Sequence, residues 1–170
     1  MSKGKDNQLS SFEKQLDRVI GWISFAEAKN AALIALNITS MAVIAEIFDK
    51  SIGLGAVTLT FFSISTVISL VSFFPNNTGA ERDSDNILNY ANISSLIDSK
   101  SYLDRHILRY EKGGEMNYEN LKEDISNQIY NNSKIALIKN TLFKYALIVD
   151  IIAFATFVVY VLQVVGIVPS

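Results

Sequence analysis

The chain has 170 residues, 49% of them hydrophobic, with 15 lysines and arginines against 17 aspartates and glutamates. Such a length holds one domain-sized unit, and a net charge of −2 excludes the strong positive field that recruits nucleic acid non-specifically. The lack of cysteine and the single histidine, His106, exclude disulfides, thiolate metal sites and a histidine metal cluster.

The N-terminal region predicts a short tail followed by an amphipathic helix. Residues 1–8 are polar without an apolar period, so we expect them to form a flexible tail. Between residues 9 and 30, apolar side chains such as Phe12, Leu16 and Val19 recur at helical spacing. Because its polar face mixes both charge signs, this cytosolic helix is expected to pack against another helix rather than lie in the membrane interface.

Two apolar segments come next, residues 31–48 and 54–74, with a short connection between them. The second segment contains no charged residue and the first contains only Glu46, so both have the length and apolarity of bilayer-spanning helices. A pair of soluble core helices is the alternative, but so short a chain has too little interior to bury them on every side. Residues 31–74 are therefore predicted to form a transmembrane hairpin.

The middle segment, residues 75–140, is too long and too periodic to be a loop. Apolar spacing between residues 87 and 97 predicts one short helix. Ser101 followed by Asp104 approximates a capping box and predicts the start of a second helix. The acidic residues of this segment are scattered along the predicted helix surfaces and are assigned to solvated faces.

A last helix is expected to begin near Asn117 and to continue without a breaker into a third membrane span, residues 141–170. The predicted fold class is an all-α membrane protein. It has a transmembrane helical hairpin plus a C-terminal span, and a cytosolic helical bundle formed by the extended first and last helices and two short helices.

The distribution of lysine and arginine predicts the orientation. These residues concentrate in the N-terminal flank and the middle segment, whereas the hairpin connection holds only Lys50 and the C-terminal tail holds none. By the positive-inside rule, the N-terminus and residues 75–140 are cytoplasmic, and the hairpin turn and the C-terminus face away.

Few residues offer chemistry. The sequence has no phosphate-binding glycine loop and no recognisable catalytic group, so we expect no enzyme activity. Two ionisable residues, Glu46 and Asp150, lie inside spans, where each would cost roughly 3 kcal/mol if exposed to lipid at mid-membrane. The sequence leaves two interpretations open for them: they face each other or a water-filled interior, or they reach the two membrane interfaces.

Residues 17–32 carry a recognisable pattern at the membrane boundary. Trp22 and the isoleucine after it come first. Glu27 and Lys29, with one residue between them, follow, and the apolar hairpin comes after these. The plainer interpretation of these residues is an aromatic side chain at the membrane interface and an intrahelical ion pair.

Two later stretches complete the pattern. Residues 86–93 follow the hairpin, and residues 118–136 contain the run Asp-Ile-x-x-Gln-Ile, with Lys139 after it. In this order around a membrane hairpin, the three stretches resemble the transmembrane effectors of the Pycsar anti-phage systems, over nearly the whole chain.

The resemblance implies an effector in the bacterial inner membrane that acts in antiviral defence. A partner pyrimidine cyclase would make cyclic CMP or cyclic UMP after phage infection, and the effector would impair the membrane and cause abortive infection. No cofactor is implied, and we expect a homo-oligomer because the spans of one copy cannot enclose a wide pore. The alternative is a structural or accessory membrane subunit that binds a protein partner through its cytosolic helices.

A cyclic mononucleotide presents a phosphate, a ribose and a flat base, which call for a cation, an amide and an aromatic face. The candidates for ligand binding in the predicted cytosolic part are Arg82, Tyr90, Asn92, Arg105, Arg109, Tyr118, Gln128 and Lys139. The plainer interpretation of each is a surface ion pair or a packing tyrosine. The chain lacks a recognisable cyclic-nucleotide-binding β-roll, so direct binding is inferred from how the family signals.

Overall fold

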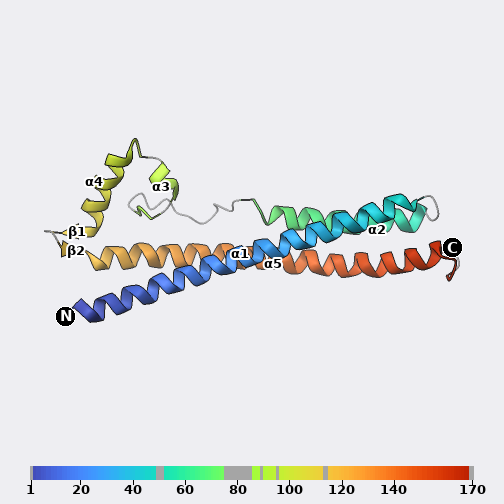
Figure 1. Ribbon diagram of the computed structural model, residues 1–170, viewed down its shortest axis with the longest axis horizontal. Coiled ribbons are helices and arrows are strands. Elements are labelled where there is room, and N and C mark those ends of the chain that lie inside the picture. The colour runs from blue at the N-terminus through green and yellow to red at the C-terminus, as the bar shows by residue number, and fades with distance from the viewer. Residues whose placement is uncertain are drawn as a thin grey trace. The chain divides into compact units, whose positions relative to one another are not determined.

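The structure, a computed structural model, describes residues 2–48, 52–74, 86–88, 90–94, 96–112 and 115–168 (Figure 1). In chain order the helices of these ranges are α1 (Ser2–Glu46), α2 (Ile52–Val71), α3 (Tyr90–Ser94), α4 (Ser99–Tyr110) and α5 (Tyr118–Val164). Two short strands, β1 (Glu111–Lys112) and β2 (Glu115–Met116), pair antiparallel between α4 and α5.

Helices α1, α2 and α5 each contain a stretch long and apolar enough to cross a membrane. The predicted all-α membrane fold, with a helical hairpin and a C-terminal span, is therefore confirmed. The two strands contain two residues each and only connect α4 to α5, so they do not change the fold class.

The chain divides into two compact units. The polar unit comprises Met1–Ile23 and Asn76–Ala136, and the hairpin unit comprises Ser24–Pro75 and Leu137–Ser170. Helices α1 and α5 each contribute residues to both units.

The apolar core of the hairpin unit joins all three of its helices. Ile44 from α1, Phe62 from α2, and Ala153 and Tyr160 from α5 are fully buried together. The Tyr160 hydroxyl donates a hydrogen bond to the Ile47 carbonyl at 2.7 Å, just past the end of α1. A helix leaves its last carbonyls without partners inside the helix, so this bond satisfies one of the acceptors at that end.

Gly55 on α2 lies against the rings of Phe48, just past the end of α1, and Tyr160 on α5. A Cβ atom at Gly55 would lie 3.2 Å from ring carbons of both Phe48 and Tyr160, whereas one at Gly53 would meet nothing within 4 Å. Alanine is a better helix former than glycine. We expect Gly53→Ala to leave the thermal midpoint in detergent unchanged or raised, and Gly55→Ala to lower it relative to Gly53→Ala. An equal gain for both variants would contradict the tight contact.

The first helix begins earlier than predicted. Residues 2–8, which the sequence assigns to a flexible tail, form the first turns of α1. Their polar composition gives no sign of packing against another helix. Adding residues to an existing helix nevertheless costs little once the helix has nucleated.

The first short helix of the middle segment is smaller than the apolar spacing predicted. Only Tyr90–Ser94 is helical as α3. Ile87 lies before it and is 2% exposed, whereas Ile97 lies after it and is 96% exposed. Among the described residues of 87–97, the expected helix is therefore limited to Tyr90–Ser94.

The start of α4 is also corrected. Asp98, not Ser101, is the N-cap residue, and its carboxylate accepts a hydrogen bond from the Ser101 amide at 2.7 Å. This hydrogen bond holds the pKa of Asp98 below its usual value. Aspartate caps a helix as well as serine does, so the helix begins one turn before the predicted capping box.

Candidate functional site

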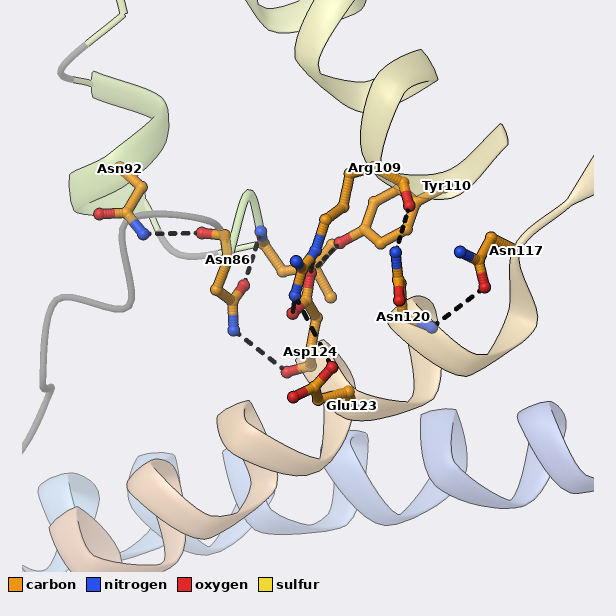
Figure 2. A network of polar contacts seen from close by, with 9 residues as sticks. Asn86, Asn92, Arg109, Tyr110, Asn117, Asn120, Glu123 and Asp124 are labelled. Carbon is orange, nitrogen blue, oxygen red and sulfur yellow. Dashed lines mark hydrogen bonds and ion pairs between the residues drawn. The ribbon is translucent and has the colours of Figure 1, made fainter. Parts of the chain in front are cut away.

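Asp124 is at the centre of a buried polar network in the polar unit (Figure 2). Its carboxylate accepts hydrogen bonds from Arg109 Nη2 at 2.7 Å and Nε at 3.2 Å, and from the Tyr110 hydroxyl at 2.7 Å. Arg109 and Tyr110 are the last two residues of α4, and Asp124 lies in the second turn of α5. The carboxylate therefore ties these two helices together.

The short strands between α4 and α5 bring the two helix ends to the same place. Glu111 of β1 pairs with Met116 of β2, and the backbone amide of Asn117 donates to the Tyr110 carbonyl. The Asn120 side chain donates to the Arg109 carbonyl at 2.8 Å, which satisfies one of the free acceptors at the end of α4.

Asn86 extends the network to the segment before α3. Its side chain is buried, donates to the Asp124 carbonyl at 3.3 Å and accepts from the Leu88 amide at 2.9 Å. Asn92 in α3 donates to the Asn86 carbonyl at 2.7 Å. Figure 2 shows Asn92 pointing to Asn86, and Asn86 pointing to α5 at Asp124.

The charges within the network are matched. Asp124 is fully buried, and Arg109, whose side chain is 20% exposed, supplies the compensating positive charge. Glu123 also approaches Arg109, at 3.9 Å, but it is exposed and contributes little. Burial, followed by the hydrogen bond to Asp124, raises the pKa of Tyr110 above its usual value, so its hydroxyl remains a donor at physiological pH.

A pocket of about 340 Å³ adjoins this network, lined by Ile87, Arg105, Leu108, Arg109 and Asn120. Its volume falls at the lower end of the range of about 300–1,000 Å³ usual for small-molecule sites. Arg105 and Arg109 are four residues apart on α4, so they share one face of the helix. Two guanidinium groups, an amide and an apolar wall suit a small anionic ligand with a flat ring.

Three of the eight predicted ligand residues come together here: Arg105 and Arg109 line the pocket, and Asn92 contacts Asn86. Tyr118 and Gln128 lie half-buried on α5 and are not among the described residues that line the pocket. The remaining three sit as follows: Arg82 lies outside the described residues, Tyr90 is described only as the first residue of α3, and Lys139 belongs to the hairpin unit.

Sequence reasoning missed four residues of this site: Asn86, Tyr110, Asn120 and Asp124. Asp124 was assigned to a solvated helix face, yet it is fully buried. A signal was present, because Asp124 opens the Asp-Ile-x-x-Gln-Ile run of the resemblance and directly precedes the buried Ile125.

The boundary motif does not form the intrahelical pair considered for it. Glu27 lies 3.0 Å from Lys139 Nζ, and Lys29 Nζ donates to Asn140 Oδ1 at 2.9 Å. Residues two apart on a helix point in different directions, so Glu27 and Lys29 reach separate partners on α5. The predicted position of Trp22 at the membrane interface stays a prediction, and its side chain is exposed.

Lys139 also contacts α2. Its buried ammonium group donates to the Ser72 carbonyl just past the end of α2. Asn30 on α1 donates to the Ser72 hydroxyl at 3.0 Å. These contacts join α1, α2 and α5 within the hairpin unit. We call the residues that make them the three-helix clamp: Glu27, Asn30, Ser72 and Lys139.

The two intramembrane ionisable residues differ in their surroundings. Glu46 is the last residue of α1 and is exposed. Asp150 is 2% exposed, and its carboxyl group lies against the side chains of Ser65 and Asn37. The buried position of Asp150 favours a carboxyl group that faces the interior of the hairpin unit, and the position of both residues relative to the membrane interfaces stays a prediction.

The comparisons with known proteins bear on the whole chain. A family model described as the Pycsar effector protein domain matches residues 11–167. The matched domain is not a known catalytic family. No curated protein and no solved structure matches the chain.

Proposed function

The chain belongs to the Pycsar effector protein family and is an anti-phage defence effector, and from this we propose that it responds to cyclic CMP or cyclic UMP by impairing the bacterial inner membrane. The response leads to abortive infection. A pyrimidine nucleotide cyclase supplies the signal, and the effector acts as a homo-oligomer because three spans in one copy cannot enclose a wide pore.

The observation that carries the proposal is the pocket beside the Asp124 network. The cyclic phosphate has one negative charge, which the Arg105 guanidinium can bind through charge-assisted hydrogen bonds. Leu108, which is exposed, offers apolar surface to the base, and the Asn120 amide lies in reach of its polar edge. Arg109 is held by Asp124, so its guanidinium group has a fixed position beside the pocket while its charge is matched by that carboxylate, and Arg105 is the cation assigned to the phosphate.

Helix α5 offers a route from this pocket to the membrane. It carries Asp124 in the polar unit and Lys139 and Asp150 in the hairpin unit, without a break in the helix. A ligand that changes the contacts at the start of α5 therefore acts on the same helix that holds the three-helix clamp. The orientation proposed from the charge distribution keeps the pocket cytoplasmic, on the side where a cyclase releases its product.

Arg105→Ala should weaken binding of the activating nucleotide by about tenfold or more, because a hydrogen bond to a charged group contributes roughly 1.5–3 kcal/mol. The measurement is calorimetric titration of the full chain in detergent with cyclic CMP and, separately, cyclic UMP. Lys100→Ala removes an exposed cation from the same helix and serves as the control that should bind normally.

Two results would contradict the proposed site. Unchanged affinity in Arg105→Ala would place the ligand elsewhere, and no binding of either nucleotide to the intact protein would exclude a direct response. Propidium entry and a potential-sensitive dye, followed in cells while each nucleotide is raised, test the membrane effect. An intact membrane with both nucleotides would favour the accessory-subunit alternative.

A further inference from the structure

The interior of the hairpin unit contains a run of buried polar side chains. We define the polar seam as Asn37 and Ser40 on α1, Ser65 and Ser69 on α2, and Asp150 on α5. Along each helix the seam lies between the three-helix clamp and the apolar core around Phe62. Polar residues inside a span are costly and are retained where they bind, relay or conduct.

Three helices meet within the seam. The Asn37 amide donates to Ser65 Oγ at 3.0 Å, and Ser65 Oγ donates to the Ala146 carbonyl at 3.1 Å. The carboxyl group of Asp150 lies against both Asn37 and Ser65. Hydroxyl, amide and carboxyl groups from α1, α2 and α5 thus converge at one level of the bundle.

Several of these groups lack a hydrogen-bonding partner. Asn37 Oδ1, Ser69 Oγ and Asp150 Oδ1 are buried and have no partner among the residues that the structure describes. Buried polar atoms are almost always paired, so each exception calls for an explanation such as water or an ion. Small apolar residues at these positions would also let the helices pack closely and would leave no polar atom without a partner.

An aromatic cluster ends the polar seam. The Phe62 ring is fully buried and packs edge-on against Phe154 at 5.1 Å and against Phe157 at 6.2 Å between ring centroids. Apolar constrictions of this kind close channels by excluding water.

We propose that the polar seam is the wall of a transmembrane path for monovalent cations, closed here by the Phe62 cluster and made cation-selective by Asp150. The proposal rests on the proposed membrane-impairing function and names what crosses the membrane. When α1, α2 and α5 separate, water enters the seam and hydrates the Asp150 carboxylate. Its charge attracts potassium and sodium ions and repels chloride, and the seam oxygens replace part of the hydration shell.

The test measures ion selectivity in proteoliposomes that contain the full chain, with a KCl gradient and the nucleotide that activates it. Asp150→Asn should lower the potassium-to-chloride permeability ratio by about tenfold, because it removes a unit charge from the path and nearly preserves its shape. Glu46→Gln removes the other intramembrane charge from an exposed position and should leave the ratio unchanged. An unchanged ratio in Asp150→Asn would overturn the proposal.

A second pair of variants separates the seam from the signal. Phe62→Ala should raise potassium efflux about tenfold without any nucleotide, because the apolar constriction is removed. Adding Asp150→Asn to Phe62→Ala should abolish the cation preference of that leak. If the wild-type chain shows no nucleotide-dependent flux, the proposed function fails. If Phe62→Ala folds and inserts but shows no potassium leak, the proposed path is overturned.

Discussion

Asp124→Asn should destabilise the polar unit by about 3 kcal/mol, the lower end of the cost of breaking a buried ion pair by removing one partner. The substitution leaves Arg109 without its counter-ion and Tyr110 without its charged acceptor. The lower end applies because Arg109 retains some exposure to water. A loss of this size is a large share of the 5–15 kcal/mol by which folded proteins are stable.

Hydrogen exchange of the full chain in detergent measures this effect on α4 and on the first turns of α5, where protection should fall. Glu123→Gln is the matched control, since it removes the adjacent carboxylate, which is 63% exposed and 3.9 Å from Arg109. Exposed substitutions of this kind usually change stability by less than about 0.5 kcal/mol. Equal losses in the two variants would show that burial of Asp124 is not the cause.

Lys139→Met should open the three-helix clamp. Methionine keeps much of the length of the side chain but cannot donate to the Ser72 carbonyl or pair with Glu27. Losing charge-assisted bonds worth roughly 1.5–3 kcal/mol shifts the equilibrium away from the clamped state by about 10-fold to 150-fold. We therefore expect increased dye entry in cells that express this variant without a cyclase.

Lys144→Met, an exposed lysine of the same helix, should leave the membrane intact at equal expression. Glu27→Gln should give a weaker form of the same effect, because Glu27 is 43% exposed. The double variant should add less than the sum of the two, since both residues belong to one contact. A membrane that stays closed in Lys139→Met would exclude the clamp as a determinant of the closed state.

The spans were predictable because their signal is local. The run of uncharged residues 54–74 indicates a membrane helix by its own length and apolarity, whatever it packs against. The buried position of Asp124 was not predictable in this way, because it depends on the pairing of β1 with β2, which brings Arg109 and Tyr110 to α5. A carboxylate on a charged helix looks the same in the sequence whether or not another helix covers it.

The partners of Glu27 and Lys29 show what spacing does reveal. The plainer interpretation, an intrahelical ion pair, was wrong because residues two positions apart do not face each other on a helix. Which residues of α5 they reach depends on tertiary packing, and the sequence holds several candidate lysines and amides there. The predicted start of α4 at Ser101 was late by one turn, because Asp98 caps the helix and aspartate and serine are both good cap residues.

Helix α5 supplies a hydrogen bond at each end of the hairpin: Lys139 binds the carbonyl that follows α2, and Tyr160 binds the carbonyl that follows α1. Positions 139 and 160 are 21 residues apart, which corresponds to a rise of about 32 Å along a helix. The hydrocarbon layer of a bilayer is about 30 Å thick. The two bonds are therefore separated by about the thickness of that layer, and we expect a thinner or thicker bilayer to strain one of them before any ligand is bound.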